Sequence, residues 1–172
     1  MQTEAVRTSD SNYRQTLLDR AARLALAQGK LRKAVDLAGD VYGDAPSNAS
    51  YLDSFLASVI SAAATRKEPE AIAYAVSKTA KPLSKANGFI TLAKYYAAAK
   101  DTEKTAAALR DAARAVKDAE SSNEKLRAEI SLAKGFVEYD RAAAFEAFRQ
   151  IVDTVNKLPP AEKQKEKAVP NN

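Results

Sequence analysis

Hydrophobic positions along the chain recur at intervals of three and four residues in eight successive segments. In the first segment Leu17, Leu18, Ala21 and Leu24 follow this spacing, which places apolar side chains on one face of an α-helix. Glycine, proline and polar turn residues separate the segments. The pattern predicts an all-α protein in which eight helices pair into four hairpins, at about residues 13–42, 50–81, 83–119 and 122–157.

Several helix ends are predicted from residues that cap or interrupt a helix. Asp101 and Asp140 each precede an apolar segment, where an aspartate can accept a hydrogen bond from the first helical turn. Ser50 and Asp53 approximate a capping box for the third helix. Pro82 should end the fourth helix, because the residue before a proline is steered away from helical geometry.

Part of the helical pattern repeats after forty residues. The segment ITLAK at 90–94 returns as ISLAK at 130–134, and each is followed at the same offset by an aromatic residue, Tyr96 and Phe136. Repeats of this length are typical of stacked helix hairpins. One hairpin cannot bury its apolar face alone, so neighbouring hairpins stack to build a continuous core.

The last two hairpins resemble tetratricopeptide repeats. The motifs LAxxY at 92–96 and LAxxF at 132–136 are similar to the first-helix signature of that family, and AxxxF at 144–148, followed by Pro159, is similar to the second-helix signature. Thr105 replaces the alanine of the third hairpin, and the family's tryptophan is absent. The resemblance implies a right-handed αα-superhelix of about four hairpins, with a superhelix of HEAT type as the alternative.

The polar ends of the sequence set the expected domain limits. We expect a polar lead at 1–12, a single helical-repeat domain at 13–160, and a polar, disordered tail at 161–172. In the tail, lysines and acidic residues alternate without an apolar period, which is typical of segments that cannot bury enough apolar surface to fold.

The composition argues against an enzyme. The chain has no His and no Cys, which excludes imidazole and thiolate chemistry and zinc sites built on those ligands. Ser-x-x-Lys occurs at 122–125 and 131–134, but the accompanying elements of Ser-Lys enzymes are missing. The five glycines are isolated and make no phosphate-binding loop. We therefore expect no catalytic residues, no metal and no cofactor.

Charge and hydropathy bear on partners and compartment. The formal net charge is +5, and both signs are interleaved, so no specific nucleic-acid interface is expected. No stretch of eighteen apolar residues and no signal peptide is visible. The sequence thus predicts a soluble protein without membrane contact, cytoplasmic by default, and periplasmic or secreted if it is a trimmed mature form.

The repeat resemblance also implies a binding surface, a concave face lined by the first helix of each hairpin. Two sets of residues occupy matching positions on the first helices of the last two hairpins: Asn87, Ile90 and Lys94, and Arg127, Ile130 and Lys134. Spacing of three, four and seven residues puts the members of each set on one helix face. Charge-assisted hydrogen bonds from these lysines could hold an acidic or extended peptide, although exposed lysines often only solvate a surface.

These observations favour a non-catalytic adaptor or scaffold that binds a protein or peptide, an acidic one in particular. The alternative is structural self-assembly, in which Ala143, Phe145 and Val152 of the last helix form an end-to-end contact between chains. The expected state is then a monomer or a weak homo-oligomer.

Overall fold

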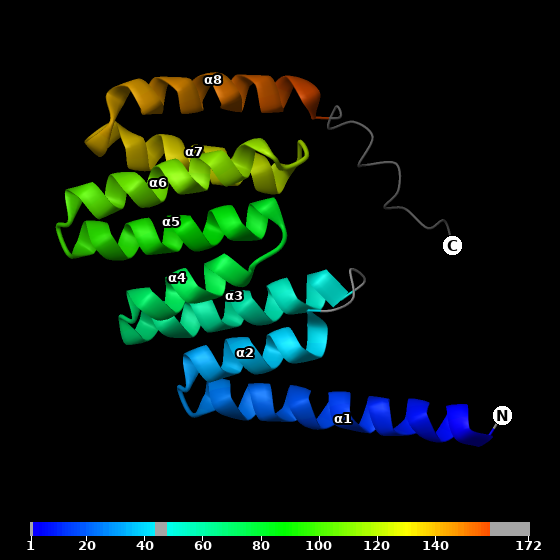
Figure 1. Cartoon of the computed structure of the whole chain (residues 1–172). Helices are drawn as coiled ribbons and strands as arrows, with labels where there is room; N and C mark the ends of the chain where they lie inside the picture. The colour runs from blue at the N-terminus through cyan, green and yellow to red at the C-terminus, as the bar shows by residue number, and fades with distance from the viewer. Residues whose placement is uncertain (1, 44–47, 159–172) are drawn as a thin grey trace, which may run out of the picture.

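The computed structural model describes residues 2–43 and 48–158, which form eight α-helices and confirm the all-α prediction (Figure 1). The helices are α1 (Gln2–Ala27), α2 (Leu31–Tyr42), α3 (Ala49–Arg66), α4 (Pro69–Lys78), α5 (Pro82–Ala98), α6 (Thr102–Lys117), α7 (Asn123–Tyr139) and α8 (Arg141–Lys157). Among these residues no helix combines the length and the apolar composition needed to cross a membrane.

Consecutive helices pack in pairs, as the four predicted hairpins require. Helix α1 packs on α2, α3 on α4, α5 on α6 and α7 on α8, and the pairs follow one another in chain order from α1 to α8 (Figure 1). First helices also contact each other, α3 with α5 and α5 with α7. Helix α5 therefore has a first helix on each side, whereas within residues 2–43 and 48–158 α7 contacts no first helix other than α5.

Helix α1 begins earlier than the sequence pattern predicts. It starts at Gln2, not near Tyr13, so most of the expected polar lead is helical. No glycine or proline occurs before Gly29, and each residue added to an existing helix gains a backbone hydrogen bond. The weak helix formers Ser11 and Asn12 thus prolong the helix instead of starting it. The expected disordered tail, 161–172, lies outside the described residues.

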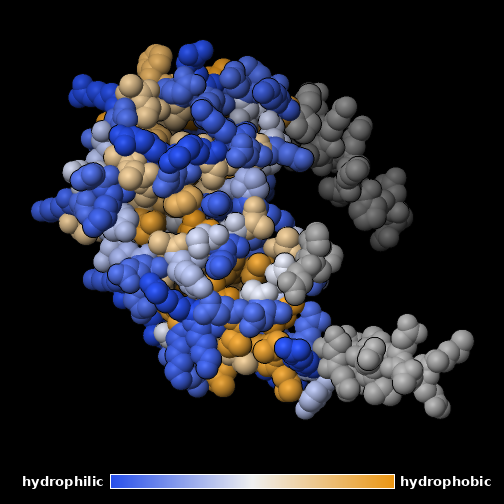
Figure 2. Space-filling view, viewed as in Figure 1, coloured by the Kyte–Doolittle hydropathy of each residue, from blue (hydrophilic) through white to orange (hydrophobic). Residues whose placement is uncertain are grey.

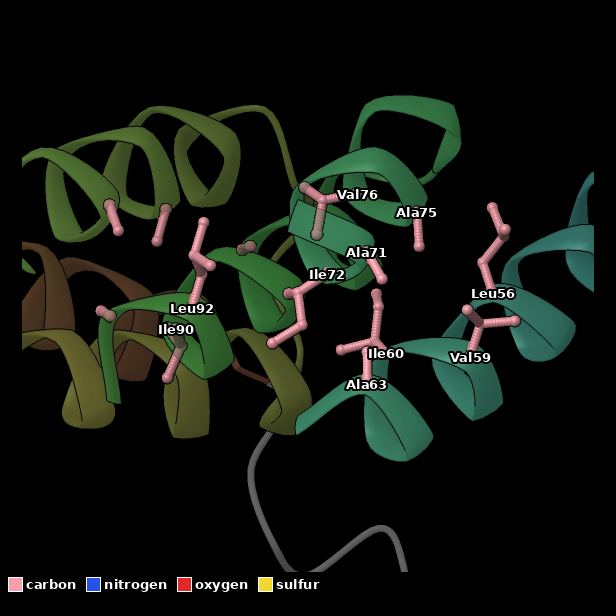
Figure 3. Packing of buried hydrophobic residues seen from close by; sticks show 14 of the residues in the cluster. Leu56, Val59, Ile60, Ala63, Ala71, Ile72, Ala75, Val76, Ile90 and Leu92 are labelled. Atoms are coloured by element: carbon pink, nitrogen blue, oxygen red, sulfur yellow. The ribbon is translucent and has the colours of Figure 1, made fainter. Parts of the chain in front are cut away.

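Buried apolar side chains form one core that runs through the stack, and alanines make up much of it. Figure 3 shows part of it, with Leu56 on α3, Ile72 and Val76 on α4, and Ile90 and Leu92 on α5. Gly88 on α5 is required there, since a Cβ at this position would lie 2.4 Å from Val76 Cγ2. Small residues let the helices approach closely enough to exclude water.

Two of the predicted helix caps are confirmed. The Asp101 carboxylate accepts a hydrogen bond from the Lys104 backbone N–H at 3.0 Å, and Asp140 accepts one from the Ala143 N–H at 3.1 Å. Each bond satisfies an N–H group that lacks a partner within the helix. These caps depend only on neighbours in sequence, which explains why the local pattern located them.

The predicted capping box of the third helix is wrong. Asp53 is buried, 4% exposed, and accepts hydrogen bonds from the backbone N–H groups of Ala80 and Lys81, both at 2.9 Å. The Lys81 ammonium in turn donates to Ser50 Oγ at 2.7 Å. Both members of the expected box therefore hold the segment between α4 and α5.

This contact also corrects the predicted end of the fourth helix. Helix α4 ends at Lys78 and not at Lys81, and Pro82 is the first residue of α5. A proline is well placed there, because the first helical N–H has no partner within the helix. The carboxylate of Asp53 binds the extended backbone between the two helices, and thereby fixes where one ends and the other begins.

Candidate functional site

A groove lies between the first helices α3 and α5. Its volume is about 330 Å³, and small or polar side chains line it, including Ala57, Ser61 and Ala64 on α3 and Asn87 and Thr91 on α5. The groove exists because alanines and serines on α3 leave space where larger residues would fill it. One of the predicted binding residues, Asn87, is thus part of a real depression on the first-helix side.

Five of the six predicted binding residues reach the surface. The side chains of this set, which we call the first-helix face, are exposed on α5 and α7: Asn87, Lys94, Arg127, Ile130 and Lys134. Those on α7 occupy the same positions, forty residues later, as residues on α5. Because α5 contacts α7, the matching positions lie on adjacent helices.

Ile90 is the exception, because the structure buries it and the predicted exposure of this residue is wrong. It is 7% exposed and belongs to the core, whereas its counterpart Ile130 is 38% exposed. Ile90 and Leu92 leave α5 in opposite directions (Figure 3), so α5 buries side chains on more than one side. Helix α5 is enclosed by α3 and α7, while α7 has no further first helix beside it in the described part of the chain.

The cations of the first-helix face are not neutralised by neighbouring carboxylates. None of the ion pairs among residues 13–43 and 48–158 involves Lys94, Arg127 or Lys134. Helix α5 contains no Asp or Glu, and Glu138, one turn after Lys134, forms no ion pair with it. Uncompensated lysines on adjacent helices produce a positive potential that attracts anionic groups.

The serine and lysine pairs noted in the sequence do not form catalytic contacts. Ser131 Oγ donates to the Arg127 carbonyl at 2.9 Å, so it turns back on its own helix. Ser122 Oγ accepts from the Lys125 backbone N–H at 3.1 Å and caps α7, while the Lys125 ammonium donates to the Ala119 carbonyl. In neither pair is a lysine amine placed to accept the proton of its serine.

A buried carboxyl that the sequence analysis missed lies between α7 and α8. Glu129 is 2% exposed, and Thr154 Oγ1 donates to its Oε1 at 2.9 Å, while Oε2 has no hydrogen-bond partner. Burial raises the pKa of the Glu129 carboxyl, and the Thr154 hydrogen bond opposes this only in part. The forty-residue repeat does indicate this burial, because Glu129 occupies the position that Phe89, a partly buried aromatic residue, holds forty residues earlier.

Glu129 lines a second cavity of about 330 Å³ between α6, α7 and α8. Leu132, Phe136 and Ala147 form apolar walls, and Arg114 and other charged residues lie around them. Arg114 pairs with Asp111 on its own helix. The cavity therefore combines apolar walls with two glutamates, Glu129 and Glu146, of which Glu129 is buried.

Replacing Glu129 with glutamine should change how stability depends on pH. The folded protein holds the Glu129 proton more tightly than the unfolded chain does, so the stabilisation is present below the ordinary glutamate pKa and is lost as pH rises through the raised folded value. Glu129→Gln stays neutral and can still accept from Thr154. As the pH rises from about 4 to about 8, the free energy of unfolding of this variant should therefore increase relative to that of the natural chain.

Urea denaturation at a series of pH values measures this difference. The matched control is Glu138→Gln, which removes an exposed glutamate from the same helix and should give no such trend. A pH-independent difference for Glu129→Gln would contradict the raised pKa.

Comparison with known proteins assigns neither a family nor a function to this chain. The sequence matches no model of a known protein family, and the search of curated proteins finds no relative. Among the described residues no group of three or more acidic side chains gathers as a metal ion would require. The first-helix face and the groove beside it are therefore the features of this chain that bear on its function.

Proposed function

We propose that this chain is a non-catalytic helical-repeat adaptor or scaffold that binds an acidic, extended segment of a protein partner on its first-helix face. In this proposal the helices form an αα-superhelix like that of tetratricopeptide repeats. The observation that carries the proposal is the pairing of a groove between α3 and α5 with unneutralised lysines on α5 and α7. A groove offers backbone and side-chain contacts, and the lysines offer charge-assisted hydrogen bonds.

The spacing of the lysines favours a particular arrangement of acidic residues. Lys94 and Lys134 hold matching positions on helices that touch, and the axes of packed helices lie about 8–10 Å apart. A peptide in the extended polyproline II conformation advances about 3.1 Å per residue and presents every third side chain on the same side. Acidic side chains three residues apart would therefore meet the two lysines in turn as the peptide crosses from α5 to α7.

Reversing both lysines tests the proposal. The probe is a set of fluorescent twelve-residue peptides with glutamates at every third position, with the same glutamates clustered together, or with glutamines in their place. We expect the evenly spaced acidic peptide to bind best, and the double variant Lys94→Glu with Lys134→Glu to bind it about 100-fold more weakly, since two charge-assisted contacts become repulsive. Fluorescence anisotropy measures the affinity, and circular dichroism checks that helicity is unchanged.

A matched control separates this site from general attraction between opposite charges. Lys33→Glu with Lys157→Glu makes the same change of net charge at exposed positions on α2 and α8. Equal losses in the two double variants would show non-specific binding, which also weakens steeply with salt. Unchanged binding by the Lys94 and Lys134 variant would remove the first-helix face from the proposal.

A further inference from the structure

The last helix carries an apolar face that no described residue covers. Figure 2 shows apolar side chains at the surface over both ends of the stack, where α8 and α1 lie. On α8 this surface, which we call the terminal seam, consists of Phe145, Phe148, Val152 and Val155, between 49% and 74% exposed. A separate face of the same helix, with Ala144, Ala147 and Thr154, is buried in the core.

The spacing of the terminal seam is that of a coiled coil. Its residues are separated by three, four and three positions, the a and d pattern through which two helices pack side by side. A single helix in a globular protein needs only one apolar stripe to join its core. The second stripe on α8 therefore indicates a further helix packed against it.

The sequence printed after α8 lacks the apolar pattern that such a helix requires. Residues 159–172 contain three prolines, and their apolar residues apart from proline are Ala161, Ala168 and Val169. A matching seam would need apolar residues at helical spacing over about ten residues. We infer that the occupant is a second copy of this chain, with its α8 antiparallel to the first about a two-fold axis.

The order of side-chain sizes supports this orientation. Both phenylalanines precede both valines, so antiparallel copies place Phe145 against Val155 of the second copy and Phe148 against Val152. A parallel pair would place phenylalanine on phenylalanine and valine on valine, which crowds one end and leaves the other loosely packed. The seam is thus complementary to itself in the sense that a two-fold interface requires.

Charges around the seam fit the same arrangement. Arg149, the charged residue nearest the axis, pairs with Glu146 on its own helix at 3.6 Å, so the copies meet there as neutral ion pairs. The other end of the stack offers a less suitable contact. Leu17 and Leu24 are exposed on α1, but Arg20 occupies the a or d position between them. A head-to-tail contact would bring this arginine against the phenylalanines and valines of the seam.

The seam is small, so the dimer should be weak. With about 200 Å² for a whole phenylalanine side chain, the exposed parts of Phe145 and Phe148 come to about 250 Å² per copy. The valines raise this to roughly 350 Å², well below the area of a permanent interface. We expect a dissociation constant on the order of 10–100 μM. Two linked first-helix faces would then favour partners that carry two acidic segments.

Sedimentation equilibrium over about 1–500 μM protein, without peptide, tests the proposal. The mean mass of the natural chain should rise from 18.5 kDa toward twice that value as the concentration increases. The mass of the Phe148→Glu variant should stay at the monomer value. The Leu17→Glu variant, which is changed on α1, should still dimerise. The exchange Phe148→Val with Val152→Phe should also dimerise, because each phenylalanine still faces a valine. A constant monomer mass of the natural chain, or loss of dimerisation in Leu17→Glu alone, would overturn the proposal.

Cross-linking tests the orientation independently, since the chain has no cysteine. In the antiparallel pair residue 149 lies beside its own counterpart, whereas the two copies of residue 156 are separated by about 18 Å along the helices. A short bismaleimide should therefore link Arg149→Cys and not Asn156→Cys. Equal linkage of both would show a parallel pair and contradict the two-fold arrangement. Peptide binding by the first-helix face should be retained in Phe148→Glu, so the two proposals can fail separately.

Discussion

Replacing Phe136 with alanine is expected to lower the free energy of unfolding by about 4 kcal/mol, because it removes a whole aromatic ring from the core and leaves a cavity. Phe136 is 2% exposed and is among the largest fully buried side chains of the described chain. It packs where α6, α7 and α8 meet, beside the cavity that Glu129 lines. In a protein of this size the loss corresponds to a melting temperature lower by about 8–16 °C.

The matched control is Phe148→Ala, the same chemical change on the terminal seam. Phe148 is 53% exposed, so in the monomer its loss should cost less than about 1 kcal/mol. Urea denaturation followed by circular dichroism, at a protein concentration where the chain is monomeric, measures both values. Equal losses in the two variants would contradict the assignment of one phenylalanine to the core and the other to the surface.

Asp53→Ala is expected to lower the free energy of unfolding by about 3 kcal/mol, since hydrogen bonds to a charged acceptor each contribute about 1.5–3 kcal/mol and alanine replaces neither of them. The lost bonds are those from the Ala80 and Lys81 N–H groups, which hold the segment between α4 and α5. Hydrogen exchange should show faster exchange at both amides, together with the lower stability.

Two further variants separate the tertiary role of Asp53 from a local one. Asp53→Asn keeps one acceptor oxygen and should lose about half as much stability as alanine does. Ser54→Ala removes only a hydroxyl that donates to the Ser50 carbonyl on the surface of the same helix, and should change stability by less than about 0.5 kcal/mol. If Asp53→Ala were as mild as Ser54→Ala, the connection between α4 and α5 would not depend on this carboxylate.

The ends and buried faces of the helices could be predicted from the sequence where interactions between residues close in the chain determine them. The caps at Asp101 and Asp140 bind amides three residues ahead, and the apolar period reports directly which face of a helix is buried. The α1 start at Gln2 was missed because a helix extends cooperatively through residues that are poor formers individually. The α4 end was missed because its determinant, Asp53, lies more than twenty residues away.

The exposure of the candidate binding residues was predicted correctly where helical phase alone decides it. Asn87 and Lys94 on α5 are exposed as expected, but Ile90, at an intermediate phase, is buried by neighbouring helices that a single-helix argument does not include. Glu129 is likewise a residue whose burial cannot be predicted from its own helix. Its residue type suggests exposure, yet its position in the repeat belongs to a partly buried aromatic, Phe89, and the fold buries it against Thr154.

The sequence by itself determined the eight helices, their pairing in chain order and the phase of each apolar face, because these depend on interactions within a few residues. Only the tertiary structure decided which sides of each helix are covered by a neighbouring helix. That distinction separates buried Ile90 from exposed Ile130, although the two residues hold matching positions in similar local sequences. Burial depends on whether a neighbouring helix packs over a position, and the segment that carries the residue does not encode that neighbour.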